Sequence, residues 1–268
     1  MTSIEVPRDH PRAESLRVRE KLIERYHEGV VALAGLIAHG RGEAFDYLLG
    51  EKTTKPALRA MEAAAAALVT AKKSVISVNG NVAALVAKDM VKLSQATGAC
   101  IEVNLFYRSL EREQAIRKLL QKAGAREVLG VGRDASATIP ELGSERRRVD
   151  TRGILVAYVI LVPLEDGDRT EALIKMGKKV IAIDLNPLSR TAQRASITIV
   201  DNIIRAAPRL TETARKLRKQ GRKKPAEIMR SFSNKENLAE SITLIRRRLL
   251  KLAMEGKHSA LEGEKPDL

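Results

Sequence analysis

The sequence predicts an α/β fold: a Rossmann-like parallel sheet with helices on both faces, N-terminal helices before it and a basic helical region after it. From residue 74 onward, short apolar runs rich in β-branched residues alternate with helical stretches. Several of these runs are apolar at every position, which is typical of strands covered on both faces. Hydrophobic residues make up 44% of the 268 residues and aromatic residues only 3%, so we expect a large aliphatic core.

Residues 1–72 are expected to form helices packed on this core, within one compact domain. In a helix over 11–33, one apolar stripe at about 100° per residue would hold Leu16, Leu22, Ile23, Tyr26, Val30 and Leu33. Arg19 interrupts the stripe and needs a partner, which could be either a structural carboxylate or a bound anion. Gly40-Arg41-Gly42 is predicted to be a hinge before a helix that starts near Glu43, and residues 58–72 form an alanine-rich helix.

Residues 73–215 are expected to form the nucleotide-binding core. The six predicted strands are 74–78, 100–106, 127–131, 154–164, 179–185 and 196–201. The helical stretches between them are 82–98, 109–124, 168–177 and 187–193. Residues 132–153 form a long irregular connection, and connections of that length often carry function.

Residues 216–268 are expected to be helical and basic. The formal charge of the chain is +15, and residues 205–257 alone hold 16 Lys or Arg against five Asp or Glu. Leu238, Ile242, Ile245, Leu249 and Leu252 form a seam that packs either on the chain's own core or on a second subunit. Residues 258–268 are expected to be disordered.

Composition also limits the possible functions. The single aromatic residue of 205–257, Phe232, offers no stacking platform, so direct nucleic-acid binding is disfavoured. A lone cysteine excludes an internal disulfide, and no apolar run is long enough to span a bilayer. We therefore expect a cytoplasmic protein without a membrane segment.

Four predicted strands end in polar residues. The polar segments are Asn79-Gly80-Asn81, 165–170, 184–186 and Asp201-Asn202. Because ligands of open parallel sheets bind beyond the carboxyl ends of the strands, four polar ends on one edge predict a site there. No P-loop is present, and no GxGxxG follows the first strand, which disfavours a dehydrogenase.

The segment 184–191 is the most informative of these ends. Asp184 and Asn186 can hydrogen-bond a ribose or a base, and Pro187 fits a first helical position. Ser189, Arg190 and Thr191 then bring hydroxyls, a guanidinium and free backbone N–H groups together, as a phosphate at a helix N-terminus requires. Arg19 and Arg41 offer further positive charge.

Several stretches together resemble a known family, from about residue 9 to about residue 215. They are HPRAESLRVREKL, GLIAHGRGEAFDYLLGE, SVNGNVAAL, EVNLFYR, VPLEDGDRTEALIKMGKKVIAIDLNPLSRTAQ and ITIVDNI. The sequence resembles archaeal phosphopantothenate synthetase, also called 4-phosphopantoate–β-alanine ligase. The resemblance implies an ATP-dependent ligase of coenzyme A biosynthesis. It would join 4-phosphopantoate to β-alanine through an acyl-adenylate, release AMP and pyrophosphate, and act as a homodimer.

The resemblance also implies a set of site residues. The implied ATP contacts are Arg19, Arg41, Asp184, Leu185, Asn186, Arg190, Thr191, Asn202 and Ile203. Arg19, Arg41 and Arg190 would stabilise charge in the reaction. The candidate substrate-positioning residues are Asn79, Asn81 and His39.

Mg²⁺ is expected to bridge the phosphates. Its ligands remain open: Glu165, Asp166 and Asp168 are candidates, although Asp168 could equally be a helix N-cap. Two alternative functions also remain open at this point. One is another Rossmann-like nucleotide-dependent enzyme such as a dehydrogenase, and the other is a basic nucleic-acid-binding protein.

Overall fold

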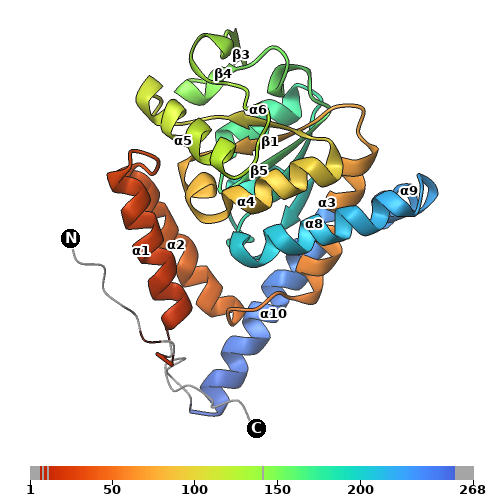
Figure 1. Ribbon diagram of the computed structural model, residues 1–268. Helices are drawn as coiled ribbons and strands as arrows, with labels where there is room; N and C mark the ends of the chain where they lie inside the picture. The colour runs from red at the N-terminus through yellow and green to blue at the C-terminus, as the bar shows by residue number, and fades with distance from the viewer. Residues whose placement is uncertain (1–6, 8, 11, 141, 257–268) are drawn as a thin grey trace.

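The computed structural model describes residues 7, 9, 10, 12–140 and 142–256, and it confirms the α/β fold. A five-stranded parallel sheet forms its centre, with the strand order β2-β1-β5-β6-β7 (Figure 1). The strands are β1 (Ser74–Val78), β2 (Cys100–Val103), β5 (Val159–Pro163), β6 (Lys179–Ile183) and β7 (Ile197–Ile199). Because all five strands are parallel, their carboxyl ends lie along one edge of the sheet.

Helices cover one face of the sheet. Ile76 and Val78 of β1 point into an apolar cluster with alanines of α3 and α8. The helices of this layer are α3 (Lys55–Thr70), α4 (Gly80–Thr97), α5 (Leu110–Lys122) and α8 (Ile203–Lys219). Small alanine side chains let α3 pack closely against α8 and β7.

The opposite face is covered by α6 (Gly167–Lys175) and by the irregular connection. Val75 and Ile160 point to this side, where they meet Leu173 of α6 and Ile154 of the connection. The connection contains a small antiparallel pair, β3 (Ala137–Thr138) with β4 (Arg148–Val149). Short α7 (Arg190–Arg194) links β6 to β7.

The prediction of a strand at 127–131 is wrong. Only Leu129 forms a bridge beside β2, through its N–H to Ile101 O (2.9 Å) and its carbonyl oxygen to Val103 N (2.9 Å). Gly130 then takes a φ of +74°, which turns the chain away from the sheet. The run at 154–164 begins with a 3₁₀ turn, so β5 is shorter than predicted.

Two predictions for the N-terminal helices are wrong. The helix predicted over 11–33 ends early, as α1 (Ala13–His27), because Gly29 adopts a φ of +74°. The next helix, α2 (Leu33–Leu49), begins only at the last residue of the predicted range. The predicted hinge at Gly40-Arg41-Gly42 is absent, since α2 runs through it without a break. Helix propensity is a weak preference that tertiary contacts override, and α2 packs against α4 and α10.

The C-terminal helices are α9 (Lys223–Ser231) and α10 (Asn234–Met254). Part of the α10 seam packs on the chain's own core, where Leu238 and Ile245 join the apolar cluster of Leu49. The second half leaves Leu249 45% exposed, and α10 extends away from the sheet toward the C-terminus (Figure 1). Residues 258–268 lie outside the described residues. Within the described part of the chain, no helix is long and apolar enough to cross a membrane.

Glu102 ties the irregular connection to the sheet. This fully buried side chain of β2 accepts hydrogen bonds from the N–H groups of Asp150 (2.9 Å) and Ile154 (2.6 Å). Burial raises the pKa of Glu102 to about 7, although the two N–H donors act in the opposite direction. Nothing in the sequence pattern marked this glutamate, because its partners are backbone groups about 50 residues away.

This carboxyl predicts a pH-dependent stability. The ordinary pKa of Glu102 is 4.5, and its pKa in the native state is about 7. At pH values between these two, the native state binds more protons than the unfolded state. The free energy of unfolding should therefore fall as the pH rises through this range, by about 3 kcal/mol in total. Urea unfolding at several pH values measures the slope, and Glu102→Gln should flatten it. An identical slope in the wild type and the variant would assign the pH dependence to other groups.

Candidate functional site

A cavity of about 290 Å³ lies at the carboxyl edge of the sheet. The predicted meeting of the polar strand ends is confirmed for β1, β5, β6 and β7, which are parallel neighbours. Helix α2 contributes another part of the wall. The residues predicted for the site that line the cavity are His39, Arg41, Asn79, Asn81, Asp166, Leu185, Asn202 and Ile203.

The end of β6 is held by its own polar side chains. Asp184 is half-buried, accepts a hydrogen bond from the N–H of Asn186 (2.9 Å), and accepts another from the hydroxyl of Ser189. Burial raises the pKa of Asp184, while the positive charge of Arg41 acts to lower it. The structure thus brings Arg41 of α2 near Asp184, although the two lie far apart in the sequence.

Helix α7 begins later than predicted. Ser189 is its N-cap and accepts a hydrogen bond from the N–H of Ala192 (3.0 Å). The predicted place of Pro187 at the first helical position is therefore wrong. Pro187 lies in a turn closed by the Asn186 side chain, which accepts the N–H of Leu188 (2.9 Å).

The structure does not bring the three predicted arginines together. Arg190 is 64% exposed, pairs with Asp168 (2.7 Å) and Glu171 (3.1 Å), and does not line the cavity. Arg19 pairs with Glu43 at 2.7 Å, and Glu43 lines the cavity. Of the two partners considered for Arg19, a structural carboxylate or a bound anion, the structure therefore contains the carboxylate, that of Glu43. Among the three, only Arg41 lines the cavity directly.

Thr191 and Asn202 make contacts within the chain. The hydroxyl of Thr191 donates to the carbonyl oxygen of Glu165 (2.8 Å), which joins α7 to the end of β5. Asn202 caps α8 by accepting the N–H of Ile204 (3.1 Å), and its amide donates to Asp46 (2.9 Å). Of these two residues, only Asn202 lines the cavity.

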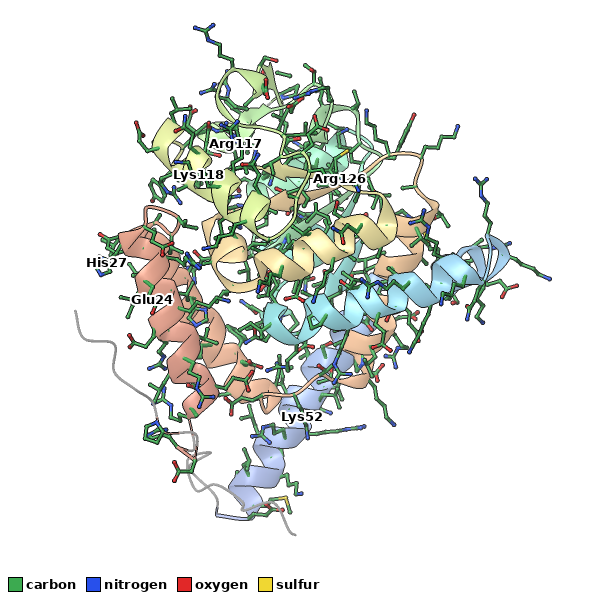
Figure 2. The ribbon with its side chains drawn as sticks, viewed as in Figure 1. Glu24, His27, Lys52, Arg117, Lys118 and Arg126 are labelled. Carbon is green, nitrogen blue, oxygen red and sulfur yellow. The ribbon has the colours of Figure 1, made fainter. Side chains whose placement is uncertain are left out.

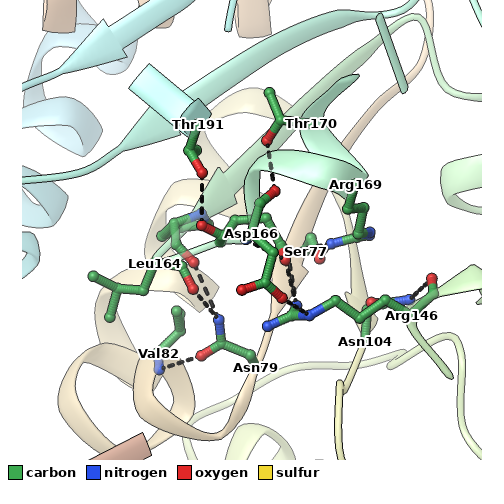
Figure 3. A network of polar contacts seen from close by, with 12 residues as sticks. Ser77, Asn79, Val82, Asn104, Arg146, Leu164, Asp166, Arg169, Thr170 and Thr191 are labelled. Atoms are coloured by element: carbon green, nitrogen blue, oxygen red, sulfur yellow. Dashed lines mark hydrogen bonds and ion pairs between the residues drawn. The ribbon is translucent and has the colours of Figure 1, made fainter. Parts of the chain in front are cut away.

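The candidate substrate-positioning residues differ in how many of their polar atoms are already hydrogen-bonded within the chain. Asn79 caps α4 by accepting the N–H of Val82 (3.1 Å), and its amide donates to the carbonyl oxygen of Leu164 (2.9 Å), so both of its polar atoms are engaged (Figure 3). Asn81 donates to the carbonyl oxygen of Gly35 (2.8 Å). His39 lines the cavity, and burial lowers its pKa, which favours the neutral imidazole.

The predicted acidic metal ligands are occupied by arginines. Glu165 is buried and binds both Arg146 and Arg169, while Asp168 pairs with Arg190. Asp168 is not a helix N-cap, since Asp166 holds that position of α6. Among the described residues, no cluster of three His, Cys, Asp or Glu side chains could hold a metal ion.

Sequence reasoning missed the basic residues on the other side of the cavity. Arg112 of α5 and Arg146 of the irregular connection both line it. Arg169 of α6 lies fully buried behind Arg146. The run Arg146–Arg148 inside a long connection was the available signal, but such a run usually marks a solvated surface.

The sequence model of the phosphopantothenate/pantothenate synthetase family matches residues 56–248 of this chain. The chain belongs to this family. The match to the synthetase family begins in α3 and ends in α10, so it includes the whole parallel sheet.

Synthetases of several archaea are similar over almost their full length. A 4-phosphopantoate–β-alanine ligase of Thermococcus kodakarensis is 52% identical over 254 residues, covering 94% of this chain and 97% of the relative. The ligase of Thermococcus onnurineus is 53% identical with the same coverage. That of Methanosarcina mazei is 49% identical over 251 residues, covering 94% of this chain and 98% of the relative.

Proposed function

We propose that this protein is an ATP-dependent 4-phosphopantoate–β-alanine ligase of coenzyme A biosynthesis. The observation that carries the proposal is the identity of about half of all residues, over 94% of the chain, with ligases of that name. The cavity at the carboxyl edge of a parallel sheet is a suitable place for a nucleotide and a small acid.

The reaction proceeds in two steps. A carboxylate oxygen of 4-phosphopantoate attacks the α-phosphorus of ATP, the bond from that phosphorus to the bridging oxygen breaks, and pyrophosphate leaves. The amine of β-alanine then attacks the acyl carbon, AMP leaves with the former carboxylate oxygen, and the amine proton passes to solvent. Neither step needs a protein nucleophile, so the protein contributes positioning and positive charge.

We propose that the nucleotide binds at the end of the cavity formed by β6 and β7. In this proposal Asp184, Leu185 and Asn186 contact the nucleoside, and Asn202 and Ile203 lie beside the phosphates at the start of α8. Arg41 is the arginine best placed to meet the α-phosphate, because it lines the cavity near Asp184. Arg19, Arg190 and Thr191 would contact ATP only after rearranging their present interactions.

We also propose that the enzyme is a homodimer. Two apolar side chains one turn apart on α2 are unusually exposed, Leu33 at 62% and Ile37 at 70%. Ile23 and Tyr26 of α1 are 38% exposed each. Exposed aliphatic and aromatic side chains on paired helices suit a self-complementary interface.

The proposed reaction predicts a defined set of products. Purified protein with 4-phosphopantoate, β-alanine, ATP and Mg²⁺ should form 4-phosphopantothenate with equal amounts of AMP and pyrophosphate. If the carboxylate carries ¹⁸O, one labelled oxygen should appear in AMP, because that oxygen bridges to phosphorus in the adenylate. Mass spectrometry of the nucleotides measures both results. ADP as the nucleotide product, or AMP without the label, would overturn the adenylate route. The absence of any ligation product would overturn the proposed function.

A further inference from the structure

We propose that a second cavity, between α3, α9 and α10, binds a small organic cation, a linear aliphatic diamine or polyamine. This cavity has a volume of about 310 Å³. It shares no lining residue with the cavity at the carboxyl edge of the sheet, so it is a separate site. Its ligand is independent of the proposed ligase reaction and is not one of the substrates of that reaction.

The amide of Asn237, in the first turns of α10, is a buried polar group that points to a ligand. Asn237 is only 3% exposed and lines the cavity. Its Oδ1 and its Nδ2 are both buried, and neither atom has a hydrogen-bond partner among the described residues. Buried polar groups of native proteins are almost always paired, because an unpaired one is destabilising. An ammonium group in the cavity would supply a donor for Oδ1.

The carboxylates around the cavity determine the charge of the ligand. Glu62 of α3 and Glu236 of α10 line the cavity, and neither takes part in an ion pair of the described chain. Glu240 lines it too, but its charge is compensated by an ion pair with Arg59, the basic residue of the wall. The wall therefore carries two uncompensated negative charges, although the formal charge of the whole chain is +15. Such a wall attracts cations and repels anions.

The arrangement of the wall favours an extended organic cation over a metal ion. Among the described residues, no three His, Cys, Asp or Glu side chains are grouped so that they could hold a metal ion, so the carboxylates of the wall do not converge on one point. Ile228 and Phe232 give the wall an apolar part, which suits a hydrocarbon chain. The face of an aromatic ring also attracts an ammonium group. Ammonium groups at the two ends of a short hydrocarbon chain match these separate carboxylates.

A ligand in this cavity would connect three helices of the fold. The residues of the wall come from α3, from α9 and the turn after it, and from α10. Because these helices come together only in the folded chain, the ligand binds the native state and not the unfolded state. At a concentration ten times its dissociation constant, the ligand should therefore raise the melting temperature by about 3–6 °C.

The test is a calorimetric titration of the full-length protein with 1,4-diaminobutane in the absence of ATP. The protein should bind one diamine per chain, and it should bind 1-aminobutane, which has one ammonium group, roughly tenfold more weakly. Glu62→Gln and Glu236→Gln should each weaken diamine binding by roughly threefold or more, because each removes one negative charge from the wall. Glu24→Gln is the matched control, since it removes a carboxylate from the exposed surface of α1, on the opposite side of the molecule from α9 (Figure 2).

Asn237→Leu distinguishes an amide that serves a ligand from one that serves the fold. Leucine has a similar shape and no polar atom to leave unpaired, so without amine the variant should melt at the same temperature as the wild type or higher. It should also bind the diamine roughly tenfold more weakly. A variant that melts at a lower temperature and binds the diamine as the wild type does would make the amide structural and overturn its role in the site.

The carboxylate variants keep the proposal testable if Asn237→Leu does not fold, because Glu62 and Glu236 are exposed side chains. A wild-type protein that binds no 1,4-diaminobutane would overturn the site. Equal binding by the wild type, Glu62→Gln, Glu236→Gln and the Glu24→Gln control would also overturn it, since the diamine would then bind elsewhere on the surface.

Discussion

Replacing Asp184 with alanine is expected to weaken ATP binding by roughly 10- to 100-fold, or about 1.4–2.8 kcal/mol. The carboxylate organises the turn after β6 through the N–H of Asn186 and the hydroxyl of Ser189. It also lies within the electrostatic influence of Arg41, which faces the cavity. Its loss would remove a hydrogen-bond acceptor for the nucleoside and would loosen the residues that surround it.

Calorimetric titration with ATP and Mg²⁺ measures this effect. Asp184→Asn tests the charge alone, because it keeps the size of the side chain and one acceptor oxygen. Asp134→Ala is a matched control, since Asp134 is an exposed aspartate outside the cavity whose ion pair is with Arg152 (3.3 Å). A folded Asp184→Ala protein with the ATP affinity of the wild type would remove Asp184 from the nucleotide site.

The sequence predicted the parallel sheet because its strands are buried on both faces. Runs such as 179–185 are apolar at almost every position, and this pattern does not depend on distant partners. The run at 127–131 is apolar too, but Gly130 turns the chain after one bridge, and the buried Val128 and Val131 pack on the core without extending the sheet. Periodicity alone cannot distinguish a strand from a buried turn of the same composition.

The sequence also predicted the edge at which the site lies, since parallel strands must present their carboxyl ends together. It predicted only some of the polar side chains that line the cavity, and it included others that do not line it. Arg190 and Arg41 appeared equivalent in the sequence, yet Arg190 pairs with Asp168 and Glu171 outside the cavity, whereas Arg41 lines its wall. Arg112 and Arg146 remained unnoticed because their environment is created by backbone oxygens and by a carboxylate brought from other elements. Side-chain availability is a tertiary property that spacing along the chain does not encode.

Glycine at position 80 allows α4 to pack closely against the link between α1 and α2. A Cβ there would overlap the carbonyl oxygen of Val30, a backbone atom that cannot move aside without shifting the link between α1 and α2. Gly80→Ala is therefore expected to lower the free energy of unfolding by about 3 kcal/mol. A melting temperature lower by roughly 10 °C, measured by calorimetry, would correspond to this loss.

The same substitution should also lower ligase activity, because Val30 and the first turn of α4 together hold the Arg112 guanidinium, which lines the cavity. Gly40→Ala is the matched control: nothing lies within 4 Å of a Cβ at Gly40, which sits inside continuous α2. There the change should raise stability by about 0.5–1 kcal/mol, since alanine favours a helix and restricts the unfolded chain. If both variants had the same melting temperature, the close approach at Gly80 would not contribute to the stability of the fold. If Gly80→Ala melted at a lower temperature yet kept the wild-type ligase activity, the cavity wall at Arg112 would not depend on the position of α4.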